Sequence, residues 1–578
     1  MMIKKLRWPL AIVFLALLAI GILLVSQQSI PPQSSPAGGG AAPVVEPATG
    51  GVYAEGLIGA FGRFNPVLDY ANAVDRDVDR LLFSGLVRYD DRGLPVGDLA
   101  DSWGISRDGL IYNFSIRPNA VWHDGQAVTS DDVIFTLELL RDELSPAPPD
   151  VKALWQQVQV LRLDEHTLQF RLPEAYAPFL DYLSFGVLPE HLLGDKSFED
   201  IVNDRFNVNP VGCGPYRFDH LIVEDGQVKG VVLALFGDYY GKKPFIEQLA
   251  FHYYPDASTA YQAYQAGEIL GLGSVPLDIL PQVLKEARLN LHSGRLPAMT
   301  LILLNLDNPR LPFFQDVAVR RALMRGLNRQ WMVDNLLGGQ AILAEGPIFP
   351  GTWAYYDGLE RLTFDAQQAL DELKRAGYTL PAAGGEVREK DGIPLEFELL
   401  FPDDEAHAAL AEAIQRDWSL LGVGVNLKAV PYDALVSDYL DSRAYQAALV
   451  DLNFSQAHDP DPYPFWHQAQ LTGGQNYSMW NDRQASEYLE QARVTVDLAE
   501  RVRLYRNFQV RFMEQLPALP LFYPVYSYAL SVDVQGVSMG PLFEPADRFN
   551  TISNWFLLSR RAVGPTSAPQ IIIPTNTP

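Results

Sequence analysis

One short segment, VWHDGQAVTSDDVIFTLELL, holds side chains that could act as acids, bases or metal ligands. His123 stands beside Asp124, and a second acidic pair, Asp131 and Asp132, follows. Thr129 precedes Asp132 by three residues, the spacing of a helix capping box, and acidic residues are favoured in the first turn of a helix. His123 and Asp124 specify no reaction by themselves, because no nucleophile accompanies them. The segment therefore predicts the start of a helix.

Signatures of common enzyme classes are missing from the sequence. It contains neither GxSxG nor HExxH, and its single cysteine, Cys213, rules out both a CxxC motif and an intramolecular disulfide. The segment GDYYGKK is one residue short between its glycines and has Lys243 where a phosphate-binding loop needs serine or threonine. We expect no catalytic residues and no cofactor. Cys213 is expected to be a small buried residue.

Two histidines toward the C-terminus raise the question of a metal site. His458 and His467 could share a neighbourhood with Asp459 and Asp461. The segment HDPDPY, however, contains two prolines, which fix backbone angles and remove N–H donors. A structural loop is the preferred interpretation, and we predict no metal site.

Length and charge narrow the class of protein. The chain has 578 residues, which exceeds the usual size of one domain. Its hydrophobic content of 48% and charged content of 20% are ordinary for a globular protein. The formal net charge of −25 would repel a phosphate backbone, so nucleic acid is not an expected partner.

The N-terminus indicates export. Basic residues in MMIKKLR precede an uncharged apolar stretch, Trp8–Val25. Its length fits either an uncleaved membrane anchor or a cleaved signal peptide within residues 1–28, and the basic flank should stay inside the cell. No cysteine follows the stretch, so attachment of lipid to an N-terminal cysteine is excluded. The body is therefore expected outside the cytoplasm, in the periplasm or at the cell surface, tethered by this helix.

Low-complexity segments flank the globular body. Residues 29–51 are rich in Pro, Gly, Ala and Ser and predict a flexible linker, and residues 562–578 predict a disordered tail. Within the body, apolar residues alternate from Leu110 to Ile116, which predicts a half-buried strand. The segment FDAQQALDELKRAGY predicts a helix with Asp365 as N-cap and Gly377 at its end.

The body also contains eight segments that carry a family resemblance. They are LADSWGISRDGLIYNFSIRPNAVWHDGQAVTSDDVIFTLELL (Leu99–Leu140), VLPEHLL (Val187–Leu193), NPVGCGPYRF (Asn209–Phe218), FGDYYGKKPFIEQLAFHYYPDASTAYQAYQAGEI (from Phe236), PFFQDVAVRRALMRGLNRQWMVDNLLGG (Pro312–Gly339), GPIFP (Gly346–Pro350), FDAQQALDELKRAGY (Phe364–Tyr378) and HDPDPY (His458–Tyr463). In this order they resemble the extracellular solute-binding proteins of family 5, the peptide- and nickel-binding components of ABC importers. The resemblance spans about Val52 to Asn554.

The resemblance implies an α/β fold of the periplasmic-binding-protein type, in which two lobes are joined by a hinge around a ligand cleft. Lobe I is expected from residues 52–82, 205–299 and 524–561. An inserted subdomain is expected from residues 83–204, and lobe II from residues 300–523. Ligand binding in such a fold is coupled to closure of the hinge.

The resemblance also implies a non-enzymatic function in transport. The protein is expected to capture a peptide or similar polar solute and deliver it to an ABC permease, a heterodimer or homodimer served by cytoplasmic ATPases. It is expected to act as a monomer. The alternatives are a solute sensor with the same fold and, more remotely, a secreted hydrolase that uses His123 or Asp124.

Ligand contacts are expected from aromatic and amide side chains, because peptide or sugar recognition needs flat apolar surfaces and a few fixed polar groups. The expected contacts are Phe64 and Asn65 from lobe I, and Asn453, Phe454, Gln456, Tyr477 and Trp480 from lobe II. The alternative for each aromatic residue is ordinary core packing.

At one position the chain departs from the short-peptide binders that it resembles. Those proteins carry an aspartate three residues before the acidic-Pro pair, where it holds the α-amino group of the peptide by a charge-assisted hydrogen bond. Gln456 stands there in this chain, and an uncharged amide loses much of that attraction. Asp451 would replace it only if the loop had a different shape. This departure therefore favours a longer peptide, an oligosaccharide or another polar solute as the ligand.

Overall fold

The computed structural model describes residues 47–558, except residues 91, 455–457 and 541. Its largest sheet has 12 strands. Ten of them follow one another in the order β18 (Gly424–Val430), β17 (Glu396–Pro402), β19 (Ala447–Asn453), β13 (Ala298–Leu304), β20 (Ala518–Ser531), β11 (Gly271–Leu272), β1 (Val52–Ile58), β10 (Gln248–Tyr254), β9 (Gln227–Leu235) and β8 (Tyr216–Glu224), while β12 (Leu289–Arg295) and β14 (Ala341–Leu343) pair with β20. Parallel and antiparallel neighbours both occur, so the sheet is mixed.

A separate four-stranded sheet lies in the N-terminal part of the body. Its order is β4 (Ala100–Ile105), β5 (Ile111–Ile116), β7 (Thr167–Arg171) and β6 (Gln159–Asp164). Three two-stranded ribbons complete the β-structure of the described residues: β2 (Val87–Tyr89) with β3 (Pro95–Gly97), β15 (Glu389–Lys390) with β16 (Ile393–Pro394), and β21 (Val534–Gln535) with β22 (Phe556–Leu557).

Helices cover the sheets. The longer ones are α2 (Ala73–Leu82), α3 (Ser130–Arg141), α4 (Pro149–Gln157), α7 (Ala257–Ala266), α9 (Val317–Arg325), α10 (Arg329–Asn335), α11 (Ala366–Arg375), α12 (Glu405–Ser419), α15 (Arg483–Val494) and α16 (Leu498–Gln515). Shorter α-helical turns are α5 (Glu190–Leu193), α6 (Phe198–Val202), α8 (Leu280–Val283), α13 (Tyr432–Ala434) and α14 (Tyr463–Trp466). Helical segments of other types are η1 (Ala177–Leu183), η2 (Arg205–Val208), η3 (Pro312–Gln315), η4 (Leu435–Leu440), η5 (Gln468–Gln470) and η6 (Pro545–Asn554). No helix of the described residues is long and apolar enough to cross a membrane, and the predicted anchor of residues 1–28 lies outside them.

The predicted capping box is confirmed at the start of α3. Thr129 is the N-cap, its hydroxyl accepts from the backbone N–H of Asp131 at 3.3 Å, and Asp132 accepts from the backbone N–H of Thr129 at 2.7 Å. The helix predicted after Asp365 is confirmed as α11, whose N-cap carboxylate accepts from Gln368 at 2.8 Å. Gly377 follows it with φ +94°, a left-handed conformation that glycine adopts without strain.

His123 and Asp124 have structural partners. The ring of His123 accepts a hydrogen bond from the backbone N–H of Gly212 at 3.1 Å, and its other nitrogen lies 3.2 Å from the carbonyl oxygen of Gly214. His123 therefore fixes the turn that carries Cys213, which is fully buried as predicted. Asp124 pairs with His191 at 2.8 Å.

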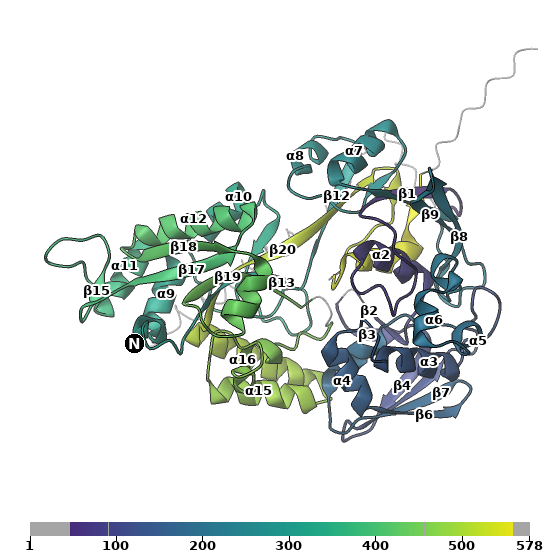
Figure 1. Ribbon diagram of the computed structural model, residues 1–578, viewed down its shortest axis with the longest axis horizontal. Coiled ribbons are helices and arrows are strands. Elements are labelled where there is room, and N and C mark those ends of the chain that lie inside the picture. The colour runs from purple at the N-terminus through teal and green to yellow at the C-terminus, as the bar shows by residue number, and fades with distance from the viewer. Residues whose placement is uncertain (1–46, 91, 455–457, 541, 559–578) are drawn as a thin grey trace, which may run out of the picture. The chain divides into compact units, whose positions relative to one another are not determined.

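The buried apolar residues form three cores. Every buried member of the first lies between Met299 and Tyr523. The second takes residues from Tyr53–Tyr253 and from Tyr526–Trp555, and the third surrounds α7 and α8. Strand β20 passes between cores, since Phe522 belongs to the first and Tyr526 to the second. In Figure 1 it runs as a long strand from the group of β17, β18 and β19 toward β12.

Candidate ligand-binding site

A cavity of ≈ 1300 Å³ lies where residues of the first and second cores approach each other. One side of its wall comes from α2, from the segment that follows it, from η1 and from η6. The other side comes from β13, from the loop after β19, from α14 and from the end of α15. Segments far apart in the chain therefore build one site, which is the usual arrangement for a ligand held between lobes.

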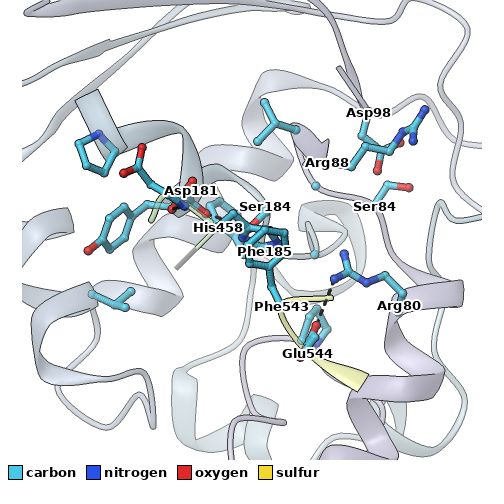
Figure 2. Close-up of a pocket in the computed structure, with 18 of the residues that line it drawn as sticks. Arg80, Ser84, Arg88, Asp98, Asp181, Ser184, Phe185, His458, Phe543 and Glu544 are labelled. Atoms are coloured by element: carbon cyan, nitrogen blue, oxygen red, sulfur yellow. Dashed lines mark hydrogen bonds and ion pairs between the residues drawn. The ribbon is translucent and has the colours of Figure 1, made fainter. Parts of the chain in front are cut away.

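His458 and Asp459, in the loop after β19, contact the opposite wall of the cavity. The ring of His458 stacks on Tyr89 with centroids 3.8 Å apart, and its centroid lies 4.2 Å from that of Phe543. Figure 2 shows His458 beside Phe543 and near Asp181. Burial lowers the pKa of His458 to about 4, so the ring is neutral at physiological pH. An uncharged imidazole between two aromatic rings acts as an apolar contact between the two sides of the cavity.

Asp181 on η1 ties the same loop to the opposite wall. One oxygen accepts from the backbone N–H of Asp459 at 2.5 Å, and the other accepts from the hydroxyl of Tyr89. Burial, followed by the charge of Asp459, raises the pKa of Asp181. The hydrogen bond between Asp181 and Asp459 joins residues that are separated by 278 positions in the chain.

Each of the two acids of HDPDPY forms an ion pair with an arginine. Arg501 on α16 donates to both oxygens of Asp459, at 2.5 and 2.8 Å, and both side chains are buried. Arg493 on α15 pairs with Asp461 at 2.6 Å and lies 3.7 Å from the centroid of the Tyr463 ring. The preferred interpretation of this segment as a structural loop agrees with these contacts. Across the described part of the chain, no group of three or more His, Cys, Asp or Glu side chains could hold a metal ion.

The wall built by α2 and η6 also contains ion pairs. Arg80 bonds Glu544 at 3.1 Å and Asp547 at 2.5 Å, and Arg76 bonds Glu544 at 3.2 Å. Figure 2 shows Arg80 and Glu544 joined across this wall. Two further acids of the same wall, Asp69 and Asp79, have no such cation among the described residues.

Of the residues predicted to contact ligand, Asn453 at the end of β19 lines the cavity. Phe64 and Asn65 lie outside its lining and are fully buried, Phe64 against Phe61 at 4.9 Å. Asn65 donates to the side chain of Asn207 at 3.0 Å and accepts from the backbone N–H of Val67. Both therefore support the wall from behind in this structure.

The other aromatic predictions also fall outside the lining of the cavity. Phe454 packs between Phe349 and Phe465, with ring centroids 4.8 and 4.5 Å away. The hydroxyl of Tyr477 donates to Asp441 at 3.0 Å. Trp480 is 5% exposed and packs against two rings of α16. Large aromatic side chains fill cores more often than they line ligand sites, and this accounts for the difference.

The predicted departure at Gln456 lies outside the described residues. Its suggested substitute, Asp451, is not in the lining of the cavity. That carboxylate accepts from Thr300 at 2.5 Å and lies 3.3 Å from His407. Burial alone would raise the pKa of Asp451, but the hydrogen bonds from His407 and Thr300 outweigh burial and lower it.

Sequence reasoning did not identify the charged wall formed by α2, η1 and η6. The only available signal was the alternation of acids and arginines in VDRDVDR, the start of α2. A charged helical segment normally indicates a solvated face. Here Asp75, Asp77 and Asp79 are all buried: Asp75 accepts from the backbone N–H groups of Gly62 and Arg63, and Asp77 pairs with Arg548 of η6.

The mixed α/β fold and the cavity between two cores define a two-lobed solute-binding protein. The sequence profile described as "Bacterial extracellular solute-binding proteins, family 5 Middle" matches residues 95–476, more than half of the chain. The chain belongs to this family, and it is a substrate-binding protein of the ABC importer class.

The chain is also similar to individual proteins, and a solved structure shares its fold. The chain is 25% identical over 523 residues to the "Oligopeptide-binding protein AppA" of Bacillus subtilis (strain 168), covering 89% of this chain and 92% of the relative. It is 27% identical over 482 residues to the "Nickel-binding periplasmic protein" of Escherichia coli (strain K12), covering 80% and 87%. The solved structure of HbpA2 from Haemophilus parasuis superposes with a TM-score of 0.74 at 23% identity, covering 88% of this chain and 100% of that one.

Proposed function

We propose that the cavity binds a peptide. The observation that carries this proposal is the cavity itself, whose ≈ 1300 Å³ exceeds the range of about 300–1,000 Å³ usual for sites of small molecules. Its wall contains acidic side chains, such as Asp98 and Glu174, and basic side chains, such as Arg88 and Arg117. Charges of both signs suit a chain with an ammonium at one end and a carboxylate at the other. The similarity to an oligopeptide-binding relative points the same way.

Capture would follow closure of two lobes on the ligand. Lobe I is proposed to comprise residues 52–82, 205–299 and 524–561, the inserted subdomain residues 83–204, and lobe II residues 300–523. The confinement of the first core to Met299–Tyr523 supports this division. The contacts of His458 and Asp459 with the opposite wall support a closed state, and a ligand favours it only by its differential affinity for that state.

Delivery would then take place outside the cytoplasm. The protein is proposed to be held at the membrane by residues 1–28 and to act as a monomer without enzymatic activity. It would pass its ligand to an ABC permease, a homodimer or heterodimer with cytoplasmic ATPases. Membership of the solute-binding family supports the permease as partner.

The test is to identify the bound species. The protein would be purified gently from its own host, analysed intact by native mass spectrometry, and then denatured to release the ligand. A series of peptides with different side chains is expected, because recognition of the peptide backbone tolerates many sequences. A single sugar, metal chelate or other non-peptide molecule would overturn the proposal.

A further inference from the structure

Two neighbouring carboxyl groups lie in the wall of the cavity. Asp69 precedes α2 and Asp79 lies on it, and both line the cavity, with exposed fractions of 7% and 3%. The two carboxyls lie within hydrogen-bonding reach of each other. Both oxygens of Asp79 are shielded from solvent, and among the described residues they accept no hydrogen bond from an N–H or O–H donor. The backbone of Asn65 approaches Asp79 without reaching hydrogen-bond geometry.

The cations nearby are already paired with other groups. Arg76 donates to the main-chain oxygens of Asp69 and Tyr70, and its Nε bonds Glu544. Arg80 bonds Glu544 and Asp547, as described above. No arginine or lysine of the described residues forms an ion pair with the carboxylate of Asp69 or Asp79.

Further acids surround the pair. The charged and titratable groups that face it are Tyr70, Asp75, Arg76, Arg80, Tyr253 and Glu544. Burial raises the pKa of both carboxyls well above the ordinary value. The negative charge of Glu544 raises the pKa of Asp69 further, and the negative charge of Asp69 raises the pKa of Asp79 further. Two buried carboxylates in contact cannot both be charged at low cost, so the pair must hold a proton or a cation.

We propose that Asp69 and Asp79 form a subsite of the cavity that binds a positively charged group of the ligand, an ammonium or a guanidinium. The inference rests on the proposed peptide ligand and narrows it to peptides that place a cation at this wall. Asp69 is the more exposed of the two and would accept the N–H of the ligand. Asp79 stands behind it and would supply the second negative charge, so it is a positioning residue.

Binding would exchange one cation for another. In the unliganded protein the proton lies between the two carboxyls. When the ammonium donates to Asp69, that proton passes to the buffer, and the ligand's positive charge takes its place. Binding of a cationic ligand should therefore release up to about one proton, whereas binding of a neutral ligand should release none.

The test uses four pentapeptides and the full chain in mild detergent. The peptides are Ala-Ala-Lys-Ala-Ala and Ala-Ala-Gln-Ala-Ala, each with a free and with an acetylated N-terminus, and calorimetry measures each affinity at pH 7. Wild type is expected to bind a cationic peptide about 10- to 100-fold more tightly than acetylated Ala-Ala-Gln-Ala-Ala, the usual effect of a hydrogen bond to a charged group. Acetylation and the Lys-to-Gln change separate the N-terminal ammonium from a side-chain ammonium.

The variants D69N and D79N should lose this preference, which is measured in each protein as the ratio of its affinities for the cationic peptide and for acetylated Ala-Ala-Gln-Ala-Ala. The matched control is E138Q, which removes an exposed acid of α3 outside the cavity and should keep the preference. Titrations in phosphate and in Tris, which differ in ionisation enthalpy, should show proton release for wild type and none for D79N. A purely structural role of Asp79 would not change the number of protons released.

The possible failures are distinguishable. If all four peptides bind wild type with equal affinity, the peptide function stands and the cation subsite is wrong. If none binds, the peptide proposal fails, and the subsite is tested separately by the thermal shifts caused by n-butylammonium and n-butanol. A shift with n-butylammonium only, lost in D69N, would support the subsite, and equal shifts with both compounds would overturn it.

Discussion

The cavity wall contains two acidic regions that differ in how their charges are balanced. In the loop after β19, each of Asp459 and Asp461 has its own arginine within hydrogen-bonding distance. In the wall of α2, Asp69 and Asp79 have each other. The first region is complete within the protein, and its acids hold a loop in place. In the second region, no arginine or lysine of the described residues pairs with Asp69 or Asp79, and this difference separates acids that build the site from acids available to a ligand.

The largest effect is expected where a complete pair is broken. Arg501→Met leaves Asp459 buried without its partner, and removing one member of a buried ion pair costs about 3–5 kcal/mol. We expect a loss of this size in the free energy of unfolding, measured with denaturant. Arg503→Met is the control, because the Arg503–Glu500 pair on the same helix is exposed and worth about 0–1 kcal/mol. Equal losses in the two variants would show that the buried pair of Arg501 and Asp459 contributes no more to stability than the exposed pair of Arg503 and Glu500.

Trp480 tests whether an aromatic residue belongs to the hydrophobic core or to the lining of the cavity. Trp480→Ala should reduce the free energy of unfolding by about 3–5 kcal/mol, since its ring packs against Phe508 and Phe512. Ligand affinity of the fraction that remains folded should stay unchanged, because Trp480 is not in the lining of the cavity. Denaturant unfolding and calorimetry measure the two quantities. A weaker affinity at unchanged stability would restore Trp480 as a ligand contact.

The unbalanced pair should respond in the opposite direction. Asp79→Asn removes the need for the pair to take up a proton on folding and allows its amide to donate to Asp69, so it should stabilise the unliganded protein at pH 7 by about 1–2 kcal/mol. The folded-state pKa of Asp79 lies above its unfolded value. The folded protein therefore holds more protons above about pH 4, and its stability falls as pH rises through that window.

The measurement is the thermal midpoint of wild type and Asp79→Asn from pH 5 to pH 8. Wild type should lose stability relative to the variant as pH increases. A variant that is less stable than wild type at every pH would show that Asp79 is a structural acid like Asp459.

The smallest effect concerns the ring that spans the cavity. The pKa of His458 is lowered to about 4 in the folded protein, below an unfolded value of about 6.5. Between about pH 4 and pH 6.5 the imidazole of His458 is therefore protonated in the unfolded chain but neutral in the folded protein. The contribution of His458 to stability is present above about pH 6.5 and is lost as the pH falls toward about 4. His458→Phe keeps the contact between Tyr89 and Phe543 and removes this sensitivity.

We expect His458→Phe to be more stable than wild type by about 1 kcal/mol at pH 6 and equal to it at pH 8. Denaturant unfolding at both pH values measures the difference. The same difference at the two pH values would show that His458 does not titrate in this way.

Much of the fold could be predicted from local patterns. The helix start at Thr129, the strand Ile111–Ile116 and the helix after Asp365 depend on a few neighbouring residues, and each is present. The order of eight segments was sufficient to identify the family and its two-lobed fold, which the comparisons confirm. Local patterns do not place a side chain relative to a cavity: of the residues predicted to contact ligand, Asn453 lines the cavity, whereas Phe64, Asn65, Phe454, Tyr477 and Trp480 lie outside its lining.

The sequence by itself determined the family and the local starts and ends of helices, because these depend on residues close together in the chain. Only the tertiary structure decided which acids have partners. Asp459 meets an arginine 42 residues away, and Arg548 meets Glu55 across 493 residues. Nothing in the sequence around Asp69 and Asp79 distinguishes them from those acids. Burial of a charge, and the presence or absence of a counter-charge beside it, are properties of the folded chain.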